Sequence, residues 1–129
     1  MKNADKLILI VDDFDAMRNL YHQFLPQEGF QLAFARDGQE ALDRAAALKP
    51  DVILMDLSLP VMDGWEATRR LKADEKTRQI PVVMLSVHGL DGARDTVAKA
   101  GFDGALAKPC MPADLIAEIT RVLNLRQPG

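Results

Sequence analysis

The sequence predicts an α/β protein in which five β–α units build an open, doubly wound sheet of five parallel strands. Two observations support this. Short apolar runs alternate five times with segments of helical periodicity, and three of the runs are nearly continuous aliphatic stretches. Such runs are typical of parallel strands that helices cover on both faces. The short loops between the segments imply right-handed crossovers.

The predicted strands are the five apolar runs. In chain order they are Leu7–Val11, Leu32–Ala35, Val52–Met55, Val82–Leu85 and Ala105–Ala107. The first, third and fourth are the strongest, because they consist almost wholly of Leu, Ile, Val and Met. The second and the fifth contain several alanines, and we expect these two strands to lie nearer the edges of the sheet.

The first and the last predicted helices each carry an apolar stripe at helical spacing. In the first helix the stripe consists of Met17, Leu20, Tyr21, Phe24 and Leu25. In the last helix it consists of Leu115, Ile116, Ile119, Val122 and Leu123. Both helices are therefore expected to pack one face against the sheet.

The three helices between them are predicted from composition and from their stop signals. Gly38–Leu48 is rich in alanine, a strong helix former, and Pro50 follows it. A third helix is expected from Gly64 to about Ala73. The fourth, from about Leu90 to Ala100, offers mostly small side chains to the core and is expected to be the most loosely held.

Length and composition limit the possible classes of protein. A chain of 129 residues with 48% hydrophobic residues is long enough for one domain, and we expect residues 1–129 to form a single one. A net charge of −3 argues against a nucleic-acid partner. The single cysteine fits a reducing compartment, and no apolar run is long enough to cross a membrane. We therefore expect a cytoplasmic protein without membrane insertion, and the start at Met1 favours a complete single-domain chain.

Polar side chains stand at the carboxyl ends of four predicted strands. They are Asp12 and Asp13 after the first strand, Asp56 after the third, Ser86 after the fourth and Lys108 after the fifth. In an open parallel sheet these ends meet at one edge, where such folds place their sites. Any one of these residues alone would pass for a solvated loop residue, but the set together predicts a functional site.

Three carboxylates at one edge need positive charge to offset their repulsion. At about 4 Å and an effective dielectric constant of about 20, each pair costs on the order of 4 kcal/mol. Lys108 supplies one positive charge, and a divalent ion would supply the rest. Oxygen ligands without histidine or cysteine favour Mg²⁺ over zinc. A carboxylate held ionised beside such cations can attack a phosphoryl group, to which Ser86 would donate a hydrogen bond.

Four sequence blocks resemble the receiver domain of bacterial two-component response regulators. They are "ILIVDDFDAMR", "DVILMDLSLPVMDGWEATRRLK", "IPVVMLSVHG" and "KAGFDGALAKP", in the order and at the spacing of that family. The resemblance runs from about Leu7 to Leu123. It implies a flavodoxin-like fold with strand order 2-1-3-4-5. It also implies a phosphoacceptor rather than an enzyme, which receives a phosphoryl group from a histidine kinase or a histidine phosphotransfer protein.

The resemblance assigns roles to the residues at the predicted edge. It makes Asp56 the phosphoacceptor, and it implies that Mg²⁺ is held by Asp12, Asp13, Asp56 and the main-chain carbonyl of Ser58. Lys108 and Ser86 would contact the phosphate. The peptide bond between Lys108 and Pro109 is expected to be cis, and His88 stands where the family tunes hydrolysis of the phosphate.

The resemblance also implies how phosphorylation would be transmitted to a target protein. The sequence departs from the family pattern at one position of this route. Family members often carry a switching aromatic three residues before the lysine, and Ala105 stands there. Switching would then rest on Ser86 and Lys108. A downstream protein target is expected on the surface of the fourth helix, fifth strand and last helix of a monomer or weak dimer. Trp65 is expected to pack on the third helix, with a partner contact as the alternative.

Three other functions fit the sequence less well. A haloacid-dehalogenase-type phosphatase also uses an aspartate at a strand end, but it needs a second aspartate where Ser58 stands. In a flavodoxin-type flavin carrier the first loop binds phosphate, which Asp12 and Asp13 would repel. A receiver-like interaction module that is never phosphorylated usually lacks an acid or the lysine, and this chain has both. That module stays the main alternative.

Overall fold

The computed structural model describes residues 6–57, 59–86, 100–107 and 112–126. Five parallel strands form one sheet in the order β2-β1-β3-β4-β5. They are β1 (Leu7–Val11), β2 (Gln31–Ala35), β3 (Val52–Asp56), β4 (Val82–Ser86) and β5 (Gly104–Ala107). The predicted fold class and strand order are confirmed, and β2 and β5 are the two edge strands.

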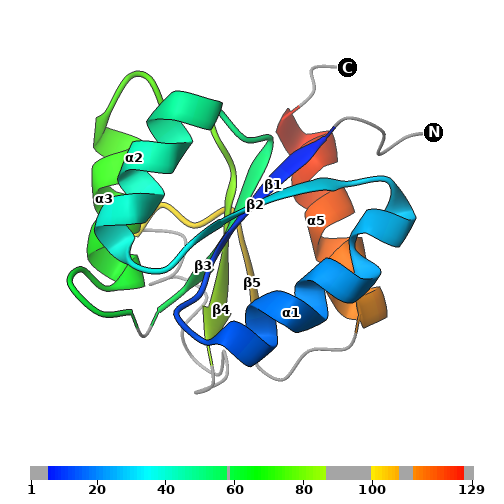
Figure 1. Cartoon of the computed structure of the whole chain (residues 1–129). Coiled ribbons are helices and arrows are strands. Elements are labelled where there is room, and N and C mark those ends of the chain that lie inside the picture. Colours follow the sequence, from blue (N-terminus) through cyan, green and yellow to red (C-terminus); the bar gives the residue numbers. More distant parts are fainter. Residues whose placement is uncertain (1–5, 58, 87–99, 108–111, 127–129) are drawn as a thin grey trace.

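Helices cover both faces of the sheet (Figure 1). The described helices are α1 (Asp15–Phe24), the short 3₁₀ helix η1 (Pro26–Glu28), α2 (Gly38–Leu48), α3 (Gly64–Ala73) and α5 (Pro112–Arg126). α2 and α3 lie on one face, and α1 and α5 on the other. The predicted fourth helix, from about Leu90 to Ala100, lies in residues 87–99 except for its last residue, and residues 87–99 are outside the described ranges. Among the helices that the structure describes, none has the length and apolar character to cross a membrane.

The core is divided by the sheet into two apolar clusters. Alternate residues of a strand point to opposite faces, so β1 sends Ile8 and Ile10 to one cluster and Leu9 and Val11 to the other. All four side chains are fully buried. At about 1.5–3 kcal/mol for each large aliphatic side chain, the central strands contribute much of the stability of the fold. The predicted strands therefore read as continuous apolar runs because both of their faces are covered.

One part of the predicted stripe of α1 is wrong. Tyr21 and Leu25 are buried as expected, but Leu20 is 44% exposed. Consecutive residues are about 100° apart around a helix, so Leu20 and Tyr21 cannot both point directly at the sheet. The contact between α1 and the sheet is narrow, and it reaches the Tyr21 side of the helix only.

The helices α2 and α3 begin at aspartate caps. Asp37 accepts a hydrogen bond from the backbone N–H of Glu40 at 2.8 Å, and Asp63 accepts one from Glu66 at 2.9 Å. These caps satisfy N–H groups that have no partner within the helix. At its other end α2 stops at Lys49, whose φ of 49° is left-handed, directly before Pro50. Capping and stop signals together explain why the predicted bounds of these two helices agree with the structure.

The loop between β3 and α3 contains a strained residue, Val61. Its φ is 67°, a left-handed value that β-branched residues rarely adopt, and its side chain is 83% exposed. The N–H of Met62 donates to the carbonyl of Pro60 at 2.7 Å, so Val61 is the centre of a tight three-residue turn. The exposed side chain makes little contact that would offset the strain.

Val61→Asn is therefore expected to stabilise the protein by about 1 kcal/mol, because asparagine tolerates left-handed backbone better than valine. Urea denaturation would measure the free energy of unfolding. Val61→Thr is the matched control, since it keeps the branched Cβ and should give no such gain. A threonine variant that gained as much as the asparagine variant would show that the backbone of Val61 is not the cause.

Candidate functional site

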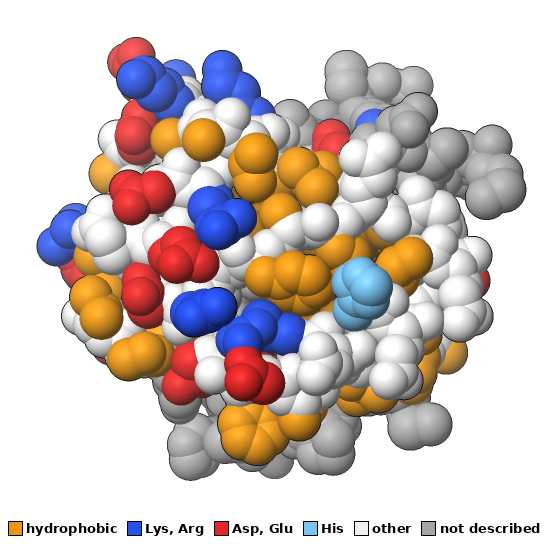
Figure 2. Space-filling model, viewed as in Figure 1, with side chains coloured by type: hydrophobic (Ala, Val, Ile, Leu, Met, Phe, Trp, Pro, Cys, Tyr) orange, Lys and Arg blue, Asp and Glu red, His pale blue; other side chains and the backbone are white. Residues whose placement is uncertain are grey.

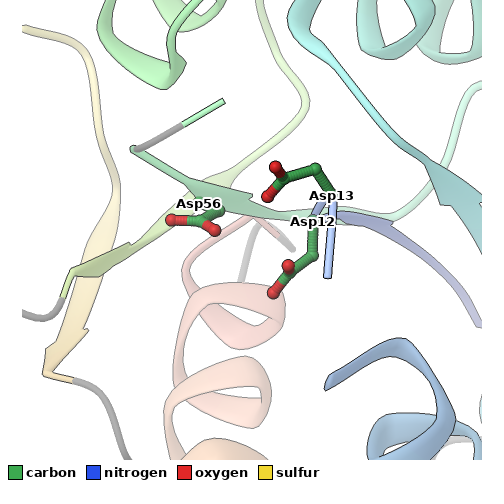
Figure 3. A group of neighbouring side chains, drawn as sticks. All are labelled: Asp12, Asp13 and Asp56. Atoms are coloured by element: carbon green, nitrogen blue, oxygen red, sulfur yellow. The ribbon is translucent and has the colours of Figure 1, made fainter. Parts of the chain in front are cut away.

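The carboxyl ends of the three central strands bring four polar side chains to one edge of the sheet. Asp56 is the last residue of β3, Ser86 is the last residue of β4, and Asp12 and Asp13 directly follow β1. Because β3 lies between β1 and β4, Asp56 is in the middle of the group. Figure 3 shows the carboxyl groups of Asp12, Asp13 and Asp56 turned toward a common space.

The three carboxylates are close enough to share one ion. One oxygen of each lies within 4.8 Å of the others. Asp12 is fully buried, Asp56 is 8% exposed and Asp13 is exposed. At that separation and an effective dielectric constant of about 20, each ionised pair repels by about 3 kcal/mol. The cluster can bind a metal ion, and a cation there would relieve the repulsion.

Asp12 also holds the backbone at the start of α1. Its Oδ1 accepts a hydrogen bond from the N–H of Phe14 at 2.9 Å, and its own N–H donates to the carbonyl of Ala35 at 3.0 Å. The carbonyl of Asp12 accepts a hydrogen bond from Nη1 of Arg18 at 2.7 Å, and Arg18 also pairs with Asp15. Sequence reasoning did not identify Arg18. Its position one turn into α1, facing back toward the aspartates, was the available signal.

Two glycines let the loop after Asp56 fold tightly against the strand tip. A Cβ on Gly64 would lie 2.3 Å from the carbonyl oxygen of Asp56, and a Cβ on Gly38 would lie 2.3 Å from that of Met62. The N–H of Gly64 donates to the carbonyl of Leu57 at 3.0 Å. The start of α3 is thus fixed against the backbone of Asp56 and Leu57. This contact explains the glycine that follows "MD" in the sequence.

The structure describes some of the predicted site residues, whereas others lie outside the described ranges. Asp12, Asp13 and Asp56 meet as predicted, and Ser86 is 5% exposed at the adjacent strand tip. Four further predicted members of the site lie outside the described residues: Ser58, His88, Lys108 and Pro109. Their roles stay predictions.

Ala105, the residue at the expected switch position, is held by α5. It is partly buried in β5, and its N–H donates to Oε2 of Glu118 at 3.0 Å. Arg121 forms an ion pair with Glu118, and its Nη2 donates to the carbonyl of Asp103 at 3.0 Å. The Arg121 guanidinium, more than the N–H of Ala105, keeps the pKa of Glu118 below its usual range. Glu118 therefore ties the edge strand β5 to α5.

This contact predicts a pH dependence of stability. A carboxyl group whose pKa is lower in the folded than in the unfolded state stabilises the fold above its unfolded pKa. That stability is lost as the pH falls through the folded pKa. The parent should therefore lose more stability on acidification below about pH 4.3 than Glu118→Gln, whose amide does not titrate. Urea denaturation over a pH series measures the difference, and parallel curves for the two proteins would refute it.

Trp65, in the first turn of α3, packs against Phe102, which lies just before β5. Its ring meets that of Phe102 edge to face, with centroids 5.3 Å apart. Such pairs contribute about 0.5–1.5 kcal/mol beyond the buried area. The side chain is still 37% exposed.

A family model, the response regulator receiver domain, matches residues 8–120 of the chain. Among curated proteins, the chain is 37% identical over 124 residues to the phosphate regulon transcriptional regulatory protein PhoB of Pseudomonas aeruginosa. That alignment covers 96% of this chain and 54% of PhoB, so the chain spans about half the length of that relative. The polar-differentiation response regulator DivK of Brucella anthropi is 34% identical over 119 residues, covering 92% of this chain and 97% of DivK.

Solved structures with the same fold include two receivers. The receiver domain of a sensor histidine kinase from Pseudomonas aeruginosa superposes with a TM-score of 0.85 at 34% identity, covering 94% of this chain and 99% of that one. That domain was crystallised with a magnesium ion coordinated in its active-site cleft. The chemotaxis response regulator CheY4 of Vibrio cholerae gives a TM-score of 0.85 at 29% identity, covering 92% and 99%.

Proposed function

Because the chain belongs to the response regulator receiver domain family, we propose that Asp56 accepts a phosphoryl group from a phosphohistidine of a partner protein, with Mg²⁺ bound beside it. The observation that carries the proposal is the meeting of Asp12, Asp13 and Asp56 within 4.8 Å at the strand tips. The histidine would belong to a histidine kinase or a histidine phosphotransfer protein. The chain would then act as a phosphoacceptor and not as an enzyme on other substrates.

The donor set fits Mg²⁺. All three ligands are carboxylate oxygens, which hard divalent ions prefer, and no histidine or cysteine belongs to the cluster among the described residues. Asp12, Asp13, Asp56 and the main-chain carbonyl of Ser58 would hold the ion. When bound, Mg²⁺ supplies positive charge that offsets both the carboxylate repulsion and the charge of the transferring phosphoryl oxygens.

The transfer itself needs a nucleophile in line with the leaving group. A carboxylate oxygen of Asp56 attacks the phosphorus, a new P–O bond forms, and the bond from phosphorus to the imidazole nitrogen breaks. The electron pair of that bond leaves with the nitrogen. The nitrogen then takes up a proton from solvent, so the partner regains a neutral histidine. Asp56 is 8% exposed, and Gly64 packs against its backbone carbonyl, so we expect the carboxylate to be held in a fixed position for this attack.

The product would be an acyl phosphate whose oxygens other residues contact. We assign Ser86, at the tip of the neighbouring strand, to a hydrogen bond with one phosphoryl oxygen. Lys108 would pair with another, held in place by a cis peptide bond before Pro109, and His88 would tune hydrolysis. Since Ala105 offers no aromatic ring, the response would rest on Ser86 and Lys108. The signal would reach a target protein across β5, α5 and the predicted fourth helix, or pass onward by phosphotransfer.

Incubation with acetyl phosphate tests the proposal without a known kinase. Intact-mass measurement should show one added phosphoryl group in the presence of Mg²⁺ and none in excess EDTA. The same result separates this function from a receiver-like module that is never phosphorylated, for which neither condition adds mass. An increase that did not depend on the metal would contradict the role of the acidic cluster.

A further inference from the structure

The two edge strands of the sheet differ in the hydrogen bonds that their outer edges make. On β5, the outward N–H of Ala105 is already bonded to Glu118 of α5. On β2, the residues that bond to β1 are the odd-numbered ones: Gln31 donates to the carbonyl of Lys6, and Ala35 accepts from the N–H of Asp12. N–H and C=O groups alternate in direction along a strand, so those of Leu32 and Phe34 point away from the sheet.

Along β2 the described residues offer one side chain to this outer edge. Oε1 of Glu40 accepts a hydrogen bond from the N–H of Arg36, just beyond the strand, at 3.3 Å. A carboxylate thus occupies the place of the next strand at that point. Within the described part of the chain, no such partner is found for the outward N–H groups of Leu32 and Phe34. A strand edge whose N–H and C=O groups point outward in this way can pair with another extended segment.

A groove of about 630 Å³ lies directly over this edge. Its floor is β2, and α1 and α2 form its two sides. The lining residues are Arg18, Asn19, His22, Leu32, Ala33, Phe34, Arg36, Glu40 and Arg44. Figure 2 shows basic, hydrophobic and histidine side chains gathered on the face where β2 runs between the two helices. The groove therefore exposes residues 32–34 of β2 between the two helices.

The charge of the groove is positive. Three arginines and one glutamate line it. Arg18 is paired with Asp15, and Nε of Arg44 lies 3.4 Å from Oε1 of Glu40. The Arg36 guanidinium forms no ion pair with the residues that the structure describes. Phe34, 6.3 Å from the ring of His22 between centroids, adds an apolar wall.

We propose that the β2 edge binds an acidic segment of a partner protein in extended conformation, as a sixth strand of the sheet. Its backbone would pair with Leu32 and Phe34, and its carboxylates would meet Arg36 and Arg44. Main-chain pairing gives affinity and the side chains give specificity in this mode of recognition. A second copy of this chain fits the edge poorly, because pairing β2 with β2 would bring two arginine-lined grooves together. This site is separate from the acidic cluster and does not depend on phosphorylation.

The probe is a peptide of about eight residues in which valine and glutamate alternate. In an extended strand all its valines then lie on one face and all its glutamates on the other. Amide hydrogen exchange, read by NMR, gives the test at the level of single residues. Addition of the peptide should slow exchange at Leu32 and Phe34 on the order of tenfold near saturation, while Ala33 and Ala35, already bonded to β1, change little. Asp56→Asn should bind the peptide as the parent does.

Matched variants separate the contributions of charge and backbone. Arg36→Glu should weaken binding on the order of tenfold, whereas Lys76→Glu, the same charge change in the loop after α3, should leave it unaltered. A peptide N-methylated at the amides facing β2, and one with lysine for glutamate, should both fail to slow exchange. The proposal is overturned if the glutamate peptide protects neither amide at millimolar concentration, or if Arg36→Glu binds it as tightly as the parent does. It is equally overturned if protection at these amides rises with protein concentration alone, which would indicate a second copy.

Discussion

Asp56→Asn is expected to abolish phosphorylation by acetyl phosphate altogether. The amide that replaces the carboxylate carries no negative charge and is too weak a nucleophile to attack phosphorus. The exchange of one oxygen for an NH₂ group changes little else, because the side chain keeps its size at a position that is only 8% exposed. Intact-mass spectrometry in the presence of Mg²⁺ measures the effect.

Asp63→Asn is the matched control for this variant. It makes the same chemical change seven residues further along the chain, where the side chain caps α3. Asparagine is as good a cap as aspartate, so the fold should be retained and phosphorylation should continue. If Asp56→Asn still gained a phosphoryl group while folded, the assignment of the phosphoacceptor would be wrong.

Asp13→Ala is expected to lower the affinity for Mg²⁺ at least about tenfold. Asp13 is the suitable member of the cluster for this test, because it is exposed, whereas Asp12 is buried and also holds the N–H of Phe14. Removal of one carboxylate also relieves repulsion. In metal-free buffer the variant should be as stable as the parent or more stable, by up to about 1 kcal/mol.

Thermal unfolding over a series of Mg²⁺ concentrations measures both effects. The parent should gain stability with each increase in Mg²⁺, since a ligand that binds only the folded state stabilises it. The variant should need much more Mg²⁺ for the same gain. Asp43→Ala, which removes an exposed carboxylate from α2, should behave as the parent does. Equal Mg²⁺ affinity in Asp13→Ala and the parent would remove Asp13 from the metal site.

The sheet and the acidic cluster could be predicted because both follow from local patterns. The strand Leu7–Val11 and the first four residues of the strand Val52–Asp56 are continuous apolar runs, which are typical of a sheet with two covered faces. Once the strands are parallel, their carboxyl ends lie at one edge, and Asp12 and Asp56 come together because β1 and β3 are neighbours. The two strands that contain alanines are less apolar, and for that reason they are expected at the edges of the sheet.

Contacts between distant side chains could not be predicted in this way. The bond from Ala105 to Glu118 joins two elements through a side chain whose direction no periodicity specifies. The exposure of Leu20 depends on how narrow the contact of α1 is, which the apolar stripe alone does not reveal. The open outer edge of β2 likewise emerges only when the strand order and the neighbouring helices are known together.

The central claim, that Asp56 carries the phosphoryl group, is tested most directly by locating the modification on the parent protein. After treatment with acetyl phosphate and Mg²⁺, borohydride reduces an aspartyl phosphate to homoserine, and peptide mass spectrometry then finds the altered residue. We predict homoserine at position 56 and at no other aspartate, and none when EDTA replaces Mg²⁺. Homoserine at position 12 or 13, or a phosphoryl group on another kind of residue, would contradict the account.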